Sequence, residues 1–244
     1  MTKQIINLPP VIHLEQALAE AGIKDPETVE KLTLTGIITK KDCRYIREKM
    51  GKTLKELDMN GAVFYKNKIF KNAFRECIGL TSVIIPDSIT KIGHFAFQDC
   101  TSLISVTIPK SVTKIGMSVF ERCTGLTSIV IPDSVTIIEH CVFRDCTGLT
   151  SITISNSAHT IELAAFRGCT GLTSVAIPDS VTIIEPYAFL GCTGLTSVTI
   201  PSSVVEIGYC VFSGCKSLTS VFIPASIVNI DKEAFEGCDA IISS

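Results

Sequence analysis

Hydrophobic and polar positions recur along this chain with a fixed period of 23 residues. One position of every repeat is a cysteine, and these ladder cysteines are Cys77, Cys100, Cys123, Cys146, Cys169, Cys192, Cys215 and Cys238. A phenylalanine three residues before each ladder cysteine keeps the same step, from Phe74 to Phe235. A period of this size over most of a chain is the signature of a solenoid, in which each coil buries its apolar residues against its neighbours.

Within each coil, counted from its cysteine as position 0, the apolar spacing predicts a short strand. Leucine stands at position 3, valine or isoleucine at position 6 and isoleucine at position 8, and proline follows at position 9 in six of seven coils. Positions 6 and 8 share one face because strand side chains alternate, and proline ends the strand because it has no N–H to donate. We therefore predict a parallel sheet on one side of a right-handed coil. Alanine or valine with phenylalanine at positions 19 and 20 predicts a short helical turn that plugs the coil.

The spacing Leu-x-x-Val-x-Ile-x-x-Ser resembles a leucine-rich repeat, with serine at position 11 where that repeat usually has asparagine. A serine hydroxyl can still bond a neighbouring backbone group. With its strand-ending proline and AFxxC tail, the unit is similar to the BspA-like class of leucine-rich repeats over residues 54–241. The resemblance implies an α/β leucine-rich-repeat solenoid, with a parallel β-sheet on one face and short helical turns or short strands on the other. It also implies a non-enzymatic module that binds other proteins, of the kind found in bacterial surface and secreted adhesion proteins.

The chain divides at residue 53 into two predicted parts. Residues 1–53 are expected to form a small helical cap over the open end of the core, with a strand at Leu32–Leu34 and a helix from Lys40 to Met50. Residues 54–244 are expected to form the solenoid. Its parts are an atypical first coil 54–76, seven full coils 77–237 and a truncated last coil 238–244.

The far end of the solenoid has no evident cap. Ile241 is expected at the leucine position of an eighth coil, after which the chain stops. An uncapped coil exposes apolar core and an unpaired strand edge. Two interpretations stay open: the sequence is a fragment of a longer protein, or two chains pair end to end. The second gives an alternative function, a cytosolic scaffold that assembles as a homodimer through its C-terminal end.

Composition and charge narrow the function classes. The chain is 46% apolar and has a net charge of −2, which excludes a disordered chain and gives no global bias toward nucleic acid or membranes. No run of 18 apolar residues exists, so we expect no membrane insertion. Residues 1–76 carry a net charge of +4, which could steer an acidic partner, but no nucleic-acid motif accompanies it. The first residues lack a secretory signal, so a cytoplasmic location is the alternative to the cell-surface or secreted one that the resemblance implies.

Candidate chemistry is sparse. The ladder cysteines are best explained as a buried column of small hydrophobic residues, because stacked side chains do not suit a disulfide and the zinc spacing is absent. Glu139, Glu162 and Glu185 share position 16 of three successive coils, as a row that could bind calcium, form a catalytic acid–base pair or be a solvated face relieved by Arg144 and Arg167. No catalytic, cofactor-binding or metal-binding residue is predicted, and we expect no enzyme and no cofactor.

The outward side of the predicted strands is the candidate binding face, because repeat proteins use that surface to bind partners. Position 5 is serine in all seven coils, and position 7 varies. The candidate partner-binding residues at position 7 are Ile84, Thr107, Val130, Thr153, Ala176, Thr199 and Phe222. By resemblance, the partner is a host extracellular-matrix or serum protein. The alternative is that this face is a hydroxyl ladder that only favours strand structure.

Two further features stand out in the repeats. A second apolar cluster, on the opposite side, is a candidate dimer or partner site or else packing between coils, and it comprises Ile183, Pro186, Tyr187, Leu190 and Tyr209. The coil 146–168 is irregular, with Ser155 in place of proline and Ala158 in place of valine, which could bend the solenoid.

Overall fold

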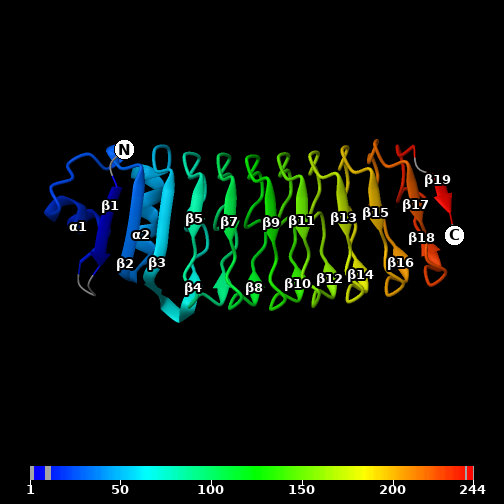
Figure 1. Cartoon of the computed structure of the whole chain (residues 1–244), viewed down its shortest axis with the longest axis horizontal. Coiled ribbons are helices and arrows are strands. Elements are labelled where there is room, and N and C mark those ends of the chain that lie inside the picture. Colours follow the sequence, from blue (N-terminus) through cyan, green and yellow to red (C-terminus); the bar gives the residue numbers. More distant parts are fainter. Residues whose placement is uncertain (1–2, 9–11, 240, 244) are drawn as a thin grey trace.

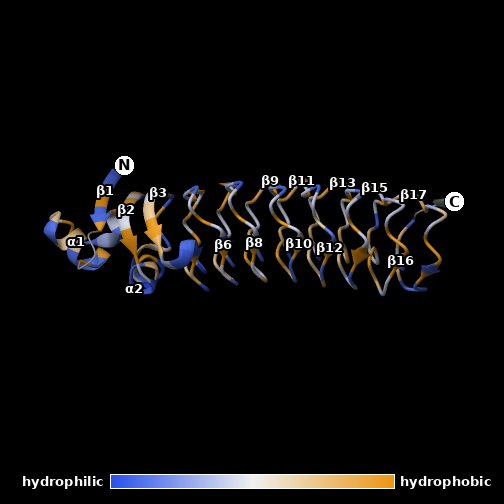
Figure 2. Ribbon diagram, turned by 90° about the horizontal axis from the view of Figure 1, so that it is seen from below, coloured by the Kyte–Doolittle hydropathy of each residue, from blue (hydrophilic) through white to orange (hydrophobic). Residues whose placement is uncertain are grey.

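The computed structural model describes residues 3–8, 12–239 and 241–243. Its coils are stacked in one line along the long axis, with the sheet strands in one row (Figure 1). Hydrophobic segments recur in every coil along this axis (Figure 2). The predicted leucine-rich-repeat solenoid with a parallel sheet on one side is thereby confirmed, although the helices of the described segments are few and lie within the first 67 residues.

The N-terminal elements extend the sheet rather than only covering its end. Their bounds are β1 Lys3–Leu8, α1 Leu14–Glu20, the 3-10 turn Pro26–Thr28, β2 Lys31–Ile38, α2 Lys40–Tyr45, the π-helical turn Ile46–Met50, β3 Glu56–Phe64 and the 3-10 turn Tyr65–Asn67. The strand predicted at Leu32–Leu34 is confirmed within β2, and the helix predicted from Lys40 to Met50 is present but changes to π-helix after Tyr45. β1 was not predicted, and it pairs in parallel with β2. The division at residue 53 and the role of residues 1–53 as a cap stay predictions.

One strand per coil builds the sheet. These strands are β5 Ser82–Ile84, β7 Ser105–Thr107, β9 Ser128–Val130, β11 Ser151–Thr153, β13 Ser174–Ala176, β15 Ser197–Thr199, β17 Ser220–Phe222 and β19 Ile241–Ser243. Ladder hydrogen bonds join them in the orders β1-β2-β3-β5-β7, β9-β11 and β13-β15-β17-β19, and the three groups follow one another along the axis (Figure 1). Equivalent residues of neighbouring coils pair, as Ser82 does with Ser105, so every repeated position forms a row along the sheet.

A two-residue strand on the opposite side of each coil forms the back of the solenoid. These back strands are β4 Lys68–Ile69, β6 Lys91–Ile92, β8 Lys114–Ile115, β10 Ile137–Ile138, β12 Thr160–Ile161, β14 Ile183–Ile184, β16 Glu206–Ile207 and β18 Asn229–Ile230. They also pair in parallel with a step of one coil, in the orders β4-β6-β8, β10-β12-β14 and β16-β18.

Continuous columns of identical side chains fill the interior. The phenylalanine rings from Phe74 to Phe235 stack face to face, with neighbouring centroids 5.1–5.7 Å apart and planes within 20°. The predicted buried cysteine column is confirmed from Cys77 to Cys215, with Cys238 partly buried. Each ladder thiol from Cys100 onward also donates a hydrogen bond, 3.0–3.3 Å long, to the carbonyl oxygen of the ladder phenylalanine 26 residues earlier, as Cys100 does to Phe74. The columns therefore join coils through both apolar contact and hydrogen bonds.

Serine hydroxyls bond neighbouring coils, as the resemblance led us to expect. Ser134 and Ser180, at position 11, donate to the carbonyl oxygen of position 12 in the preceding coil at 2.5 and 2.7 Å. In the irregular coil, Ser157 does not make this hydrogen bond. Ser155, at the proline position, donates instead to the carbonyl oxygen of Val135 at 2.7 Å. Ser155 is 1% exposed, so the departure from proline keeps a buried hydrogen bond between coils.

Two local predictions are wrong. The segment around positions 19 and 20 is a pair of tight turns and not a helical turn, because positions 18 and 22 have positive φ, as at Phe95 and Asp99. A right-handed helical turn cannot continue through such residues. In the last strand, Ile241 pairs with Ser220, and Ile242 pairs with Val221. Ile241 thus occupies a strand position equivalent to serine and not the leucine position.

Candidate protein-binding face of the sheet

The candidate residues share one face because of strand alternation. In each coil the residue at position 6 points inward, and those at positions 5 and 7 point outward. Every candidate residue is exposed, and the apolar ones stand out most, since 63% of the surface of Val130 and of Phe222 is accessible. The row lies in register along the strands, with Val130 paired to Thr153 and Ala176 paired to Thr199.

The structure brings Thr107, Val130 and Thr153 together around one shallow hollow of about 640 Å³. We call it the Val130 hollow. It is lined by residues of β7, β9 and β11 and by the turns after them, where Lys110 and Asp133 lie. The Asp133 carboxylate accepts a hydrogen bond of 2.9 Å from the backbone N–H of Asn156, so the turn of the irregular coil is fixed to the coil before it. The hollow combines an exposed apolar centre with charged side chains in the turns, a combination that suits contact with another protein.

Ile84, Ala176, Thr199 and Phe222 lie outside the Val130 hollow, farther along the same row. The structure therefore arranges the seven candidates as an extended face along the sheet rather than as one enclosed pocket. Such a surface can make many small contacts with a partner.

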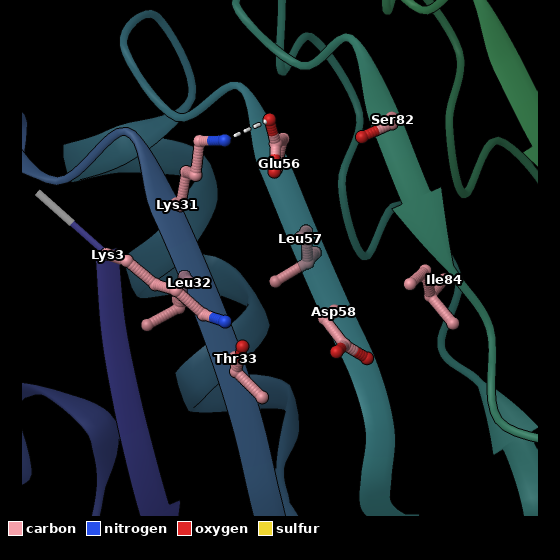
Figure 3. Close-up of a pocket in the computed structure, with 9 residues that line it drawn as sticks. All are labelled: Lys3, Lys31, Leu32, Thr33, Glu56, Leu57, Asp58, Ser82 and Ile84. Atoms are coloured by element: carbon pink, nitrogen blue, oxygen red, sulfur yellow. Dashed lines mark ion pairs between the residues drawn. The ribbon is translucent and has the colours of Figure 1, made fainter. Parts of the chain in front are cut away.

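The N-terminal end of this face is charged, a feature that the repeat pattern does not predict. Figure 3 shows Lys3 on β1 extending over β2, and Lys31 on β2 directed at Glu56 on β3, with an Nζ–Oε1 distance of 2.7 Å. Asp58 and Ile84 border the same small hollow. The signal in the sequence was the alternation in β1, where Ile6 and Leu8 are buried and Ile5 and Asn7 are exposed.

The glutamate row is divided between separate partners. Glu139 forms an ion pair of 2.7 Å with Lys114, and Glu162 lies 3.3 Å from the imidazole of His140. Within the described residues, neither Arg144 nor Arg167 forms an ion pair with this row, and Arg144 lies near Glu121 and Asp145 instead. Among the described residues, no group of three or more histidine, cysteine, aspartate or glutamate side chains could hold a metal ion.

The ladder thiols have low chemical reactivity. Burial raises the pKa of the Cys77 thiol to about 12 and raises the pKa of the thiols of Cys100, Cys123 and Cys146 well above its ordinary value. A buried thiol that stays protonated is a poor nucleophile and a poor metal ligand, since both roles need the thiolate. The cysteine column therefore serves packing.

Two bacterial repeat proteins of known structure are similar to this chain. The chain is 28% identical to a leucine-rich repeat protein from Bacteroides ovatus over 75% of this chain and 55% of that one, with a TM-score of 0.60. It is 24% identical to a leucine rich cell surface protein from Faecalibacterium prausnitzii, over 84% and 75% of the two chains, with a TM-score of 0.45. The chain thus spans just over half the length of the Bacteroides ovatus protein.

No protein of curated function matches the chain. In the part of the chain that the structure describes, no helix has the length and hydropathy to span a bilayer. A family model, the BspA type leucine rich repeat region, matches residues 67–194 and 160–243 with six copies. Proteins built of leucine-rich repeats are typically structural or interaction modules. The chain therefore belongs to the BspA-type leucine-rich-repeat family.

Proposed function

We propose that this protein is a non-enzymatic interaction module that binds another protein through the outward face of its sheet. The observation that carries the proposal is the row of exposed position-7 residues, which is continuous over seven coils and has apolar side chains at Ile84, Val130 and Phe222. Repeat proteins bind partners through the extended face of the solenoid, and exposed apolar side chains on that face can add buried apolar area to such a contact.

The Val130 hollow is the proposed centre of contact. It has room of about 640 Å³ for a side chain of a partner, and Thr107 and Thr153 offer hydroxyl groups on either side of Val130. Position 5 contributes small serine side chains all along the face, so a partner strand or loop can approach the sheet closely. The charged end formed by Lys3, Lys31 and Glu56 would then fix the direction in which the partner lies.

The partner that we propose is a host extracellular-matrix or serum protein, and the location is the cell surface or the exterior of a bacterium. The support is the membership of the BspA-type family together with the resemblance to repeats of surface and secreted proteins. Binding in such a setting relies on many modest contacts spread over a large face, which suits the extended row better than a single deep pocket.

A pull-down with a paired control tests the proposal. Immobilised wild type and a Thr153→Arg/Thr199→Arg variant are exposed to plasma, to basement-membrane extract and to bacterial lysate. The control is Thr124→Arg/Thr170→Arg, which adds the same charge at the same spacing in exposed turns after the ladder cysteines. We expect a plasma or matrix protein on the wild type and control, and at least a tenfold loss on the sheet variant.

Equal capture by all three proteins would contradict binding through the sheet face. Capture only from bacterial lysate would contradict the extracellular role and favour a cytosolic scaffold.

A further inference from the structure

The back of the solenoid carries a gradient of charge along its axis. The first residue of each back strand points outward, and in chain order these residues are Lys68, Lys91, Lys114, Ile137, Thr160, Ile183, Glu206 and Asn229. The N-terminal end of the row is basic, the middle is neutral and apolar, and the C-terminal end contains an acid. This back face differs from the sheet face, whose position-5 and position-7 rows are uncharged from β5 to β17.

The basic end places like charges side by side. Lys68 pairs in register with Lys91, and Lys91 pairs with Lys114, so three ammonium groups lie on successive strands. Like charges directly opposite one another on paired strands are destabilising. Lys114 is relieved by Glu139, but no ion pair within the described residues involves Lys68 or Lys91, and both side chains are exposed. These two lysines are available to an acidic partner.

The opposite end of the same face is apolar and acidic. Ile183 and Val205 are 50% and 54% exposed, and together with Tyr209 they border a hollow of about 450 Å³ that Glu185 and Glu206 also line. Neither glutamate takes part in an ion pair within the described part of the chain. Exposed apolar residues gathered around unpaired acids form a surface that fits a basic partner.

The symmetry of a back-to-back pair decides which strands of the two copies face each other. Two copies can meet back to back in two ways, with the two-fold axis either along the solenoid or along its strands. An axis along the solenoid would set each coil against its own equivalent, lysine against lysine. An axis along the strands, between β10 and β12, reverses the second copy and sets β6 against β16 and β8 against β14. Lys91 of each copy then faces Glu206 of the other, and Lys114 faces the apolar hollow at Ile183.

From these charges and contacts we infer that the protein forms an antiparallel homodimer through the back face, with Lys91 and Glu206 as its paired charges. This arrangement brings the basic end of each copy to the acidic end of the other and pairs the two exposed charges Lys91 and Glu206, neither of which has an ion-pair partner within the described residues of its own chain. Both sheet faces remain on the outside of the dimer. Two binding faces on one particle strengthen attachment to a multivalent surface through a raised effective concentration.

Charge reversal tests the arrangement directly. Wild-type protein is expected to approach twice 26.3 kDa in sedimentation equilibrium as its concentration rises. Lys91→Glu and Glu206→Lys each replace two attractive contacts per dimer with repulsive ones, so each variant should raise the dissociation constant by about tenfold or more. An equimolar mixture of the two variants should restore the dimer, because Glu at 91 then meets Lys at 206 in one contact and the other contact keeps the native pair.

Matched variants distinguish the back face from the rest of the solenoid surface. Lys216→Glu makes the same charge change in an exposed turn after a ladder cysteine and should leave the dimer intact. Thr153→Arg/Thr199→Arg should also leave it intact, which keeps the dimer test independent of the sheet-face proposal. A wild-type protein that stays monomeric at all concentrations would overturn the inference, even if its lysines bind a polyanion such as dextran sulfate. So would a dimer that persists in both reversal variants, which would place the contact elsewhere, such as the last coil.

Discussion

The interior and the outer surface of the coils follow the same period but obey it to different degrees. Inside, phenylalanine and cysteine recur at the same positions in every coil from Phe74 to Cys238, and their side chains form unbroken columns. On the surface, position 7 of the sheet strands varies from threonine to phenylalanine. Position 14, the first residue of each back strand, changes from lysine at Lys91 to glutamate at Glu206. Repetition is required where identical neighbours must pack at a fixed spacing, whereas an exposed position is free to vary. The exposed variable positions are therefore the ones to which we assign the proposed binding.

The largest expected effect comes from alkaline pH, which acts on the interior of every coil at once. Burial raises the pKa of the ladder thiols, to about 12 at Cys77, whereas an unfolded thiol ionises near pH 9.0. Below pH 9 this contribution to the free energy of unfolding is fully present. As pH rises above 9, unfolding releases protons and each buried thiol lowers that free energy by about 1.4 kcal/mol per pH unit.

Urea denaturation at pH 8, 9 and 10, with reductant present, measures this effect. The Cys146→Ala/Cys169→Ala variant should show a shallower decline, because it has two fewer buried thiols. A midpoint that does not move between pH 8 and pH 10 would contradict the buried column.

Removing one ring from the phenylalanine column comes next in size. Phe143 is fully buried and stacks on rings 5.5 and 5.6 Å away, so Phe143→Ala should lower the free energy of unfolding by about 3–5 kcal/mol. The matched control is Phe222→Ala on the sheet face, which should change it by less than about 0.5 kcal/mol. Thermal and urea denaturation compare the two, and a similar loss in both would remove the distinction between interior and surface.

A smaller loss of stability is expected in the irregular coil 146–168. Ser155→Ala leaves the buried carbonyl oxygen of Val135 without its donor and should cost about 1–3 kcal/mol. Ser157→Ala, two residues later, removes a side chain that the repeat normally uses but that this coil does not, and we expect almost no change. If Ser157→Ala is the more damaging variant, then Ser155 has not taken over the bond between coils.

The smallest effect on stability is expected on the sheet face. Val130→Arg places a charged side chain where 63% of the surface is already accessible, so the free energy of unfolding should change by less than about 0.5 kcal/mol. Capture of a plasma or matrix protein should nevertheless fall by tenfold or more, because the arginine fills the Val130 hollow. A variant that unfolds would show that Val130 is structural, and one that binds normally would place the contact elsewhere.

The repeat made most of the solenoid predictable from sequence, because one strand assignment applied to every coil and errors could not accumulate. The errors lie where the period gives no information. The repeat does not predict β1, which lies before it in the chain and whose register is set by pairing with β2. The apolar pattern predicts a helical turn at positions 19 and 20, whereas the structure has tight turns there. These turns depend on positive φ at positions 18 and 22, as at Phe95 and Asp99, and residues other than glycine adopt positive φ too rarely for the sequence to indicate it.

The candidate site was predictable only in part, for the same reason. Strand alternation placed Thr107, Val130 and Thr153 on one face, and the structure adds the hollow that they share. The ion pair of Lys31 with Glu56 joins two strands that the sequence analysis did not connect. Pairing between strands, rather than the residues alone, decides which exposed charges meet.

The most direct test of the central claim is photo-crosslinking from the sheet face. Val130 is replaced by photoreactive benzoylphenylalanine, and in a second protein Ile137 on the back face is replaced instead. After mixing with plasma or basement-membrane extract and irradiation, mass spectrometry identifies the adducts. We predict that position 130 is linked to a plasma or matrix protein, whereas position 137 is linked to a second copy of this chain. A matrix or plasma adduct formed at position 137 and absent from position 130 would contradict binding through the sheet.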